Sequence, residues 1–309
     1  MTARRWIIGR GLLGNAIARA RPDVPFQRRI RWSAAETAVA DLRAAATEFL
    51  ALPGPLEIYW CAGRAVTSSP QEVLDIEQAV FAAALDAIEE VGSSAADRVV
   101  FFLGSSAGGA YAGSLRPPFT ESTPPVPASA YGRTKLAMEG LLRDAATKSG
   151  WRAVIARITN IYGPGQQLGK GQGLISTLIN GSITGRPVSI YVPLDTLRDY
   201  IYEDDAGALV EAAMRRAHTL DRGETVVKVV GSGRAVSIGA LLSELERLRR
   251  RRGAIVLGQG DATGQALDLR ARTTVWTDLD HVVRTTLPEG LGKVFQASLS
   301  GLALHGVAR

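Results

Sequence analysis

Cysteine and histidine are scarce in this sequence of 309 residues, which contains one cysteine and three histidines. A single cysteine excludes a disulfide within the chain and is typical of a reducing compartment. Because Cys61 lies in an apolar run, we expect it to be a core residue. The histidines, His218, His281 and His305, lack the spacing of metal ligands, so the sequence predicts no metal site.

Long apolar segments are also lacking. The chain contains no run of about 18 apolar residues, the length that a membrane-spanning helix requires. The first residues, MTARRWIIGRG, show no apolar segment followed by a small-residue cleavage site, as a secretory signal would. These absences predict a cytoplasmic protein that has no membrane as a partner.

Acidic residues are outnumbered by basic ones, and the net charge is +6. A basic balance can indicate a nucleic acid or another polyanion as partner. The arginines are scattered, however, apart from Arg247 and residues 249–252, which end a predicted helix over 238–250, where cations interact favourably with the helix dipole. We therefore expect no nucleic-acid partner and regard a small phosphorylated ligand as the better match.

Short apolar segments alternate with helical ones along most of the chain. The predicted strands cover residues 5–8, 24–29, 56–62, 99–103, 153–158, 187–192 and 225–230, and the predicted helices include residues 13–21, 33–52, 71–91, 129–139 and 206–216. This alternation predicts an α/β fold of the Rossmann type, a doubly wound parallel sheet whose ligands bind at the carboxyl ends of the strands.

The composition changes after residue 165, where a glycine-rich segment follows. We expect residues 1–165 and 199–230 to form a dinucleotide-binding domain, and residues 166–198 and 231–309 to form a smaller α/β lobe that binds the substrate. The segment 165–173 is predicted to be a mobile loop over the site, where Gln166, Gln167, Lys170 and Gln172 supply hydrogen bonds to a ligand.

A glycine-rich turn joins the first predicted strand to the first predicted helix. Its residues are Gly9-Arg10-Gly11-Leu12-Leu13-Gly14, which have the pattern G-x-G-x-x-G. Such glycines let the backbone approach a pyrophosphate, which then lies at the N-terminus of the helix. The turn therefore predicts a dinucleotide site, and the alternative is a tight strand-to-helix turn without a ligand.

The second predicted strand bears on which dinucleotide binds. NAD sites usually place an Asp or Glu at the end of this strand, where it binds the ribose 2′-hydroxyl. This chain offers Arg28 and Arg29 there, and Arg10 in the turn. Guanidinium groups suit a 2′-phosphate, so NADP(H) is the predicted cofactor. NAD(H) is the alternative, with the arginines as an exposed strand end.

Tyr131 and Lys135 stand four residues apart in the segment SAYGRTKLAME. A helix places such residues on one face, one turn apart. The ammonium favours the phenolate form of the tyrosine, which suits a general acid or base. Taken alone, the pattern also fits an ordinary pair of surface residues.

Four further segments accompany the glycine turn, in a fixed order. They are Gly104-Ser105-Ser106-Ala107, Tyr131-Gly132-Arg133-Thr134-Lys135, residues 157–165 (RITNIYGPG) and residues 198–205 (RDYIYEDD). Together with the turn, they resemble the motifs of the extended short-chain dehydrogenase/reductase family, the NAD(P)-dependent nucleotide-sugar epimerases, dehydratases and reductases. The resemblance covers nearly the whole chain.

The resemblance implies three catalytic residues. Ser106 would hydrogen-bond the reacting sugar oxygen, and Tyr131 would exchange a proton with that oxygen. Lys135 would favour the phenolate and bind the hydroxyls of the nicotinamide ribose. A homodimer through the helices that flank the Tyr131–Lys135 motif is one arrangement open to the chain.

Other residues take binding roles by the same resemblance. Ala62 and Gly63 would line the cofactor with their backbone. Asn160 would contact the substrate or its phosphates, and Arg198 would bind the diphosphate of a nucleotide sugar. The alternative for Arg198 is an ion pair with one of three nearby carboxylates, those of Asp199, Glu203 and Asp204.

Departures from the family pattern narrow the reaction. The 4,6-dehydratases of the family carry an Asp-Glu pair where this chain has Ala107 and Gly108, so dehydration of that kind is not expected. A nucleotide-sugar 4-ketoreductase ranks first, because the arginines favour NADPH, and a 4-epimerase that retains NAD(P) ranks second. A third reading is a cofactor-binding protein that has lost catalysis, against which the intact Ser106, Tyr131 and Lys135 argue.

Overall fold

The computed structural model describes residues 2–166, 173–249, 255–258 and 266–306. Five parallel strands form the central sheet in the order β1-β2-β3-β4-β8. They are β1 (Arg4–Ile8), β2 (Leu56–Trp60), β3 (Val99–Ser106), β4 (Arg152–Ile158) and β8 (Thr225–Val230). Near-continuous apolar runs suit a parallel sheet, because both of its faces are buried.

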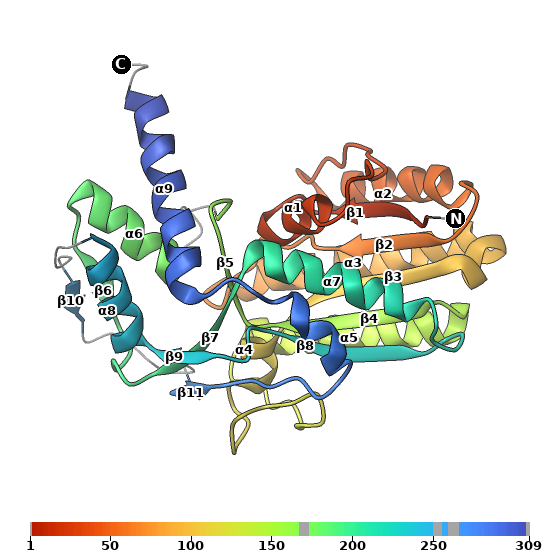
Figure 1. Ribbon diagram of the computed structural model, residues 1–309. Coiled ribbons are helices and arrows are strands. Elements are labelled where there is room, and N and C mark those ends of the chain that lie inside the picture. The colour runs from red at the N-terminus through yellow and green to blue at the C-terminus, as the bar shows by residue number, and fades with distance from the viewer. Residues whose placement is uncertain (1, 167–172, 250–254, 259–265, 307–309) are drawn as a thin grey trace.

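Helices cover both faces of this sheet (Figure 1). One face packs against α2 (Ala35–Leu50), α3 (Gln71–Gly92) and α5 (Ala130–Ser149), and the other against α1 (Leu12–Arg19) and α7 (Glu203–Ala217). Alternate strand residues serve the two layers, as the period of two in a strand requires. The expected Rossmann-type α/β fold is confirmed.

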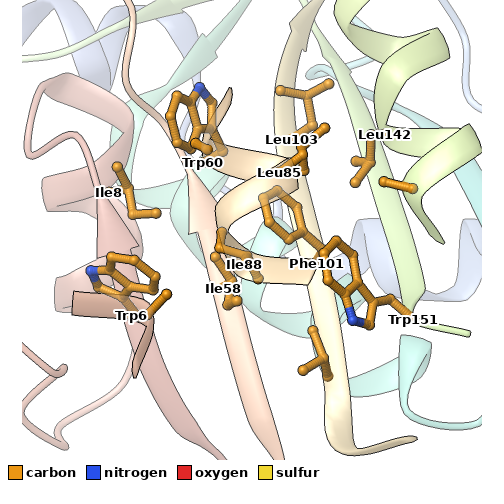
Figure 2. Close-up of a cluster of buried hydrophobic side chains, with 14 of the residues drawn as sticks. Trp6, Ile8, Ile58, Trp60, Leu85, Ile88, Phe101, Leu103, Leu142 and Trp151 are labelled. Carbon is orange, nitrogen blue, oxygen red and sulfur yellow. The ribbon is translucent and has the colours of Figure 1, made fainter. Parts of the chain in front are cut away.

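The larger core cluster is rich in aromatic side chains. Figure 2 shows Ile58 between Trp6 on one side of the cluster and Phe101 and Trp151 on the other. The Phe101 and Trp151 rings are stacked, with centroids 5.9 Å apart. Such rings bury large apolar areas, so this face anchors α3 and α5, the two helices that border the candidate site.

A second group of elements lies beyond the carboxyl ends of the central strands (Figure 1). One further sheet contains β5 (Asn160–Tyr162), β7 (Leu197–Tyr202), β9 (Ala235–Ser237) and β11 (Asp268–Leu269), and another pairs β6 (Val188–Ile190) with β10 (Ile255–Leu257). The helices of this group are α6 (Leu174–Thr184), α8 (Ile238–Arg249) and α9 (Leu287–Gly306). The division into two domains stays a prediction.

Three short elements complete the described chain: the 3-10 helices η1 (Ser93–Arg98) and η3 (Thr277–Val282), and α4 (Ala107–Tyr111). Within the described ranges, no helix has both the length and the apolar character needed to cross a membrane.

The strand predicted at residues 24–29 is wrong. Only an isolated bridge between Trp6 and Phe26 joins this segment to β1, where the Phe26 N–H donates to the Arg5 carbonyl at 2.7 Å. Pro25 has no N–H to donate to a ladder, which limits pairing here. The segment with Arg28 and Arg29 is therefore exposed, has no regular secondary structure and follows the bridge to the edge strand β1.

Candidate active site

The glycine turn follows β1 and starts α1, and two of its glycines are required by close contacts. Gly9 has φ of 92°, and a Cβ there would lie 2.3 Å from the backbone nitrogen of Ala62. A Cβ on Gly14 would lie 2.1 Å from the Gly9 carbonyl oxygen. The turn thus brings the end of β1 against the residues after β2, where Ala62 and Gly63 were predicted to line the cofactor.

Gly11 differs, because a Cβ there would meet nothing within 4 Å. It is the N-cap of α1, and no side chain caps this end of the helix. Leu12 and Leu13 form the first turn, with Leu13 packed toward Gly104 of β3. Uncapped N–H groups beside open space suit an anion. The residues present therefore fit the pyrophosphate of a dinucleotide.

The three arginines predicted to bind the cofactor phosphate differ in their side-chain contacts. Arg28 forms an ion pair with Glu48 of α2, and both side chains are exposed. Arg10 donates from Nε to Asn15 Oδ1 at 2.9 Å. Arg29 is exposed and has no ion pair with any described residue. Arg10 and Arg29 are thus the more available cations for a phosphate at this edge.

Tyr131 and Lys135 share one face of α5, as predicted. Ser129 caps the helix, with its hydroxyl accepting from the Gly132 N–H at 3.1 Å. The Lys135 Nζ atom lies 5.5 Å from the centroid of the Tyr131 ring and 2.7 Å from Glu77 Oε1 on α3. Burial lowers the pKa of Lys135, but attraction from Tyr131 and Glu77 outweighs it, so the pKa is raised. The buried amine therefore stays charged at neutral pH.

Ser106 ends β3 and caps α4, where its Oγ accepts from the Gly109 N–H at 3.0 Å. A Cβ on Gly132 would lie 2.2 Å from the Gly109 carbonyl oxygen, so α4 and α5 approach at their glycines. This contact places Ser106 and Tyr131 on adjoining elements at the same edge of the sheet. A Cβ on Gly108 would lie 4.0 Å from Ser106 Oγ, which leaves room beside the hydroxyl.

A buried polar network fixes α5 to the sheet, and sequence reasoning did not find it. Glu139 of α5 is fully buried and accepts from Ser105 Oγ at 2.7 Å and from Arg157 at 3.0 Å and 2.7 Å. Arg157 also donates to the Tyr111 hydroxyl at 2.8 Å. The available signal was the position of Glu139 one helical turn after Lys135, next to the motif.

Arg198, on β7, is a buried cation without a carboxylate. Its side chain donates to the carbonyl of Leu197 at 2.9 Å, and none of the described acidic residues lies within 4 Å. Burial lowers its pKa despite attraction from Tyr200 and Asp268. Arg198 as a whole is only 9% exposed. A buried guanidinium without a carboxylate in contact favours an anionic ligand, because the Leu197 carbonyl and the attraction from Tyr200 and Asp268 offset only part of its desolvation.

The three carboxylates considered as partners of Arg198 are engaged elsewhere. Glu203 and Asp204 pair with Arg19, at 3.3 Å and 2.7 Å. Asp199 is fully buried and accepts from the Thr159 hydroxyl at 2.9 Å and from the Ser232 N–H at 2.8 Å. Burial raises the pKa of Asp199. The ion-pair alternative for Arg198 is therefore not realised.

Asn160 is exposed just beyond the end of β4. Its Nδ2 atom donates to the carbonyl of Asp199 at 2.8 Å, which ties it to β7 beside Arg198. Because Ile158 pairs with Ser106 in the β3–β4 register, Asn160 lies two residues beyond the level of Ser106. The structure thus gathers Ser106, Asn160 and the glycine turn at the carboxyl ends of the strands.

Most of the predicted loop 165–173, including Gln167, Lys170 and Gln172, lies outside the described residues. Gln166 is described, and its Oε1 accepts from Ser176 of α6 at 2.7 Å. No cluster of three or more His, Cys, Asp or Glu suited to a metal ion occurs in the described ranges. Cys61 is half-buried after β2.

Comparison with known proteins gives four informative matches, of which two come from sequence and two from solved structures. A family model described as the NAD dependent epimerase/dehydratase family matches residues 9–229. The dTDP-4-dehydro-6-deoxyglucose reductase of Escherichia coli is 27% identical over 206 residues, which cover 65% of this chain and 61% of the reductase. The matched region thus spans about three fifths of that relative's length.

Solved structures share the fold. MoeE5 in complex with UDP-glucuronic acid and NAD is 22% identical with a TM-score of 0.76, covering 94% of this chain and 97% of that chain. RMD from Pseudomonas aeruginosa, complexed with NADPH, is 21% identical with a TM-score of 0.74, covering 97% of this chain and 100% of that chain. At such identities these structures show a common fold and nothing about the ligand of this chain.

Proposed function

The chain belongs to the NAD dependent epimerase/dehydratase family, and from this premise we propose that it performs NADP-dependent oxidoreduction at a sugar carbon of a nucleoside-diphosphate sugar. A 4-ketoreductase is the first assignment. A 4-epimerase that retains NAD(P) is the alternative.

The observation that carries the proposal is the buried guanidinium of Arg198, which has no carboxylate partner among the described residues. A diphosphate would supply the missing negative charge through two parallel hydrogen bonds, which suit the planar fork of arginine. A small neutral carbonyl compound would leave this charge uncompensated. Asn160, tied to β7 beside Arg198, would add a hydrogen-bonding side chain from the sheet.

Ser106, Tyr131 and Lys135 carry the functional groups that reduction of a keto sugar requires. The bound nicotinamide cofactor supplies or accepts the hydride at the sugar carbon. Ser106 holds the reacting oxygen through its hydroxyl, and Tyr131 gives this oxygen a proton during reduction. The ammonium of Lys135 keeps a positive potential beside the phenol ring, 5.5 Å from its centroid.

Two arguments rank reduction above epimerisation. Arg10 and Arg29 are available for a 2′-phosphate, and cells reserve NADPH for net reductions, whereas an epimerase returns its hydride to the same substrate. The E. coli relative is named as a reductase of a dTDP-activated 4-keto sugar, which supports the same assignment. The homodimer through the helices flanking Tyr131 and Lys135, and the cytoplasmic location, remain predictions.

The test begins with the wild-type protein. We expect NADPH consumption with at least one member of a panel of nucleotide 4-keto sugars, measured by absorbance, and no tightly bound cofactor after purification. Retained cofactor together with 4-epimer formation would favour the alternative.

A calorimetric titration tests the diphosphate site. A nucleoside diphosphate should bind the cofactor-loaded wild type, and Arg198→Ala should weaken binding about tenfold or more. Arg43→Ala is the matched control, because Arg43 lies on α2 and pairs with Glu90 away from the site. If the wild type binds no nucleoside diphosphate at millimolar concentration, both the reductase and the epimerase assignments fail.

A further inference from the structure

Lys135, the proposed catalytic lysine, has an acidic neighbour that no sequence motif predicted. Glu77 lies on α3, and its Oε1 atom is 2.7 Å from Lys135 Nζ. Both side chains are largely buried, at 11% and 8% exposure. A hydrogen-bonded ion pair withdrawn from water holds its geometry better than one at the surface. The ammonium is therefore held from the side of α3 as well as from its own helix.

Glu77 is itself fixed by the segment that follows β2. Its Oε2 atom accepts from the backbone N–H groups of Arg64 and Ala65, each at 3.1 Å. A Cβ on Gly63 would lie 2.9 Å from Glu77 Oε1, so the carboxylate occupies the space beside this glycine. One carboxylate thus links the segment predicted to line the cofactor with the lysine of the catalytic pair.

We propose that Glu77 is a positioning residue that holds Lys135 charged and in place beside Tyr131 and so sets the pH range of proton transfer. The charged and titratable groups of the described chain that face Lys135 are Tyr131 on α5 and Glu77 on α3. The loop after β2 offers backbone N–H groups, and Met138 offers a thioether sulfur at 4.0 Å. No other described carboxylate lies within 4 Å of the ammonium.

Electrostatics fixes the sign of the effect. Burial alone would drive the ammonium toward the neutral amine, and the carboxylate opposes this. Removing the negative charge therefore lowers the pH at which the ammonium of Lys135 loses its proton. Ketoreduction needs the proton of the Tyr131 hydroxyl and the positive charge of Lys135. In a variant without the carboxylate, the alkaline decline in rate should therefore begin at a lower pH than in the wild type.

The first experiment needs neither cofactor nor substrate. The protein is labelled with carbon-13 at the lysine ε-carbons, and Lys135 is followed by NMR during a pH titration, with Lys135→Ala for assignment. In Glu77→Gln the pKa of Lys135 should fall by about one to three pH units. In Glu77→Asp, which keeps the charge, it should stay close to the wild-type value. Equal titration of Lys135 in wild type and Glu77→Gln would overturn the proposal.

The second experiment rests on the proposed function and measures the pH profile of kcat/KM for ketoreduction. In Glu77→Gln the alkaline limb should move to lower pH by about one unit or more, and Glu77→Asp should restore it. Glu72→Gln, a matched loss of charge at an exposed site on the same helix, should leave the profile unchanged.

The outcomes of the two experiments are distinguishable. If Glu77→Gln has a lower rate at every pH but the same alkaline limb, the proposal is wrong and Glu77 only holds the loop after β2 in place. A wild type without any ketoreductase activity would refute the proposed function, while the NMR titration would still decide the role of Glu77. Urea unfolding curves show whether each variant is folded before it is compared.

Discussion

Replacement of Glu139 by glutamine tests whether the buried network behind α5, which carries the proposed catalytic residues Tyr131 and Lys135, determines both stability and activity. Glu139 is fully buried, and its two oxygens accept hydrogen bonds from Ser105 Oγ and from two nitrogens of Arg157. Arg157 is 4% exposed, so the variant leaves a buried guanidinium without its carboxylate. Breaking a buried pair by removing one partner costs about 3–5 kcal/mol.

That cost is large against the total stability of a domain, about 5–15 kcal/mol. Urea unfolding followed by circular dichroism should show a much lower midpoint for Glu139→Gln. The kcat of the folded variant should also fall, because Glu139 fixes α5, which carries Tyr131 and Lys135. Arg157→Met and the double variant complete a cycle in which the two losses should be far from additive.

A surface ion pair of the same helix provides the control. Lys148 of α5 pairs with Glu89 of α3 at 2.7 Å, with the lysine side chain 76% exposed. Lys148→Ala should leave the unfolding midpoint and kcat almost unchanged, because exposed pairs contribute little. If Glu139→Gln and Lys148→Ala have equally small effects, the network does not hold the catalytic helix.

Two further predictions concern the chemistry and the cofactor. Tyr131→Phe should reduce kcat by about 10²–10⁴-fold with little change in the Kd of NADPH, since we propose that the hydroxyl serves general acid catalysis; turnover near the wild-type value would reject this role. Arg29→Ala should weaken NADPH binding about tenfold or more and leave NADH binding unchanged, whereas Arg28→Ala should have a smaller effect because Glu48 already pairs with Arg28. Equal affinity of the wild type for NADPH and NADH, measured by fluorescence titration, would contradict both expectations.

The parts of the fold that the sequence predicted correctly are those that depend on local pattern. The strands predicted at residues 56–62 and 153–158 are found as β2, which ends at Trp60, and as most of β4, because apolar side chains on both faces allow little else in a doubly covered sheet. β3 continues to Ser106, three residues beyond the predicted end, because its small polar residues still pair with β4. Residues 24–29 failed because their composition suits a strand, while Pro25 interrupts the donors that pairing needs.

Long-range pairs explain what the sequence could not predict at the site. Glu77 and Glu139 are ordinary helix residues in the sequence, and 58 residues separate Glu77 from Lys135. Only the packing of α3 against α5 and of α5 against the sheet shows that each meets a buried cation. For Arg198, the resemblance gave a role, but only the three-dimensional arrangement could separate a free guanidinium from one paired with Asp199, Glu203 or Asp204.

The site therefore contains two buried cations, Lys135 and Arg198, of which only Lys135 has a carboxylate partner. This difference supports the separate roles that we propose for them. Lys135 has its counterion within the protein, so its charge is retained whether or not a ligand is present. Arg198 has no carboxylate within 4 Å among the described residues, and the attraction from Tyr200 and Asp268 offsets only part of the cost of its burial. An anionic ligand that pairs with Arg198 would offset the remaining cost, and a ligand that binds only the folded protein also stabilises it, by an amount that grows with the ligand concentration relative to Kd. A carboxylate in contact with Arg198 would compete with such a ligand, which is a reason for β7 to present the arginine without one if the proposed diphosphate site is correct.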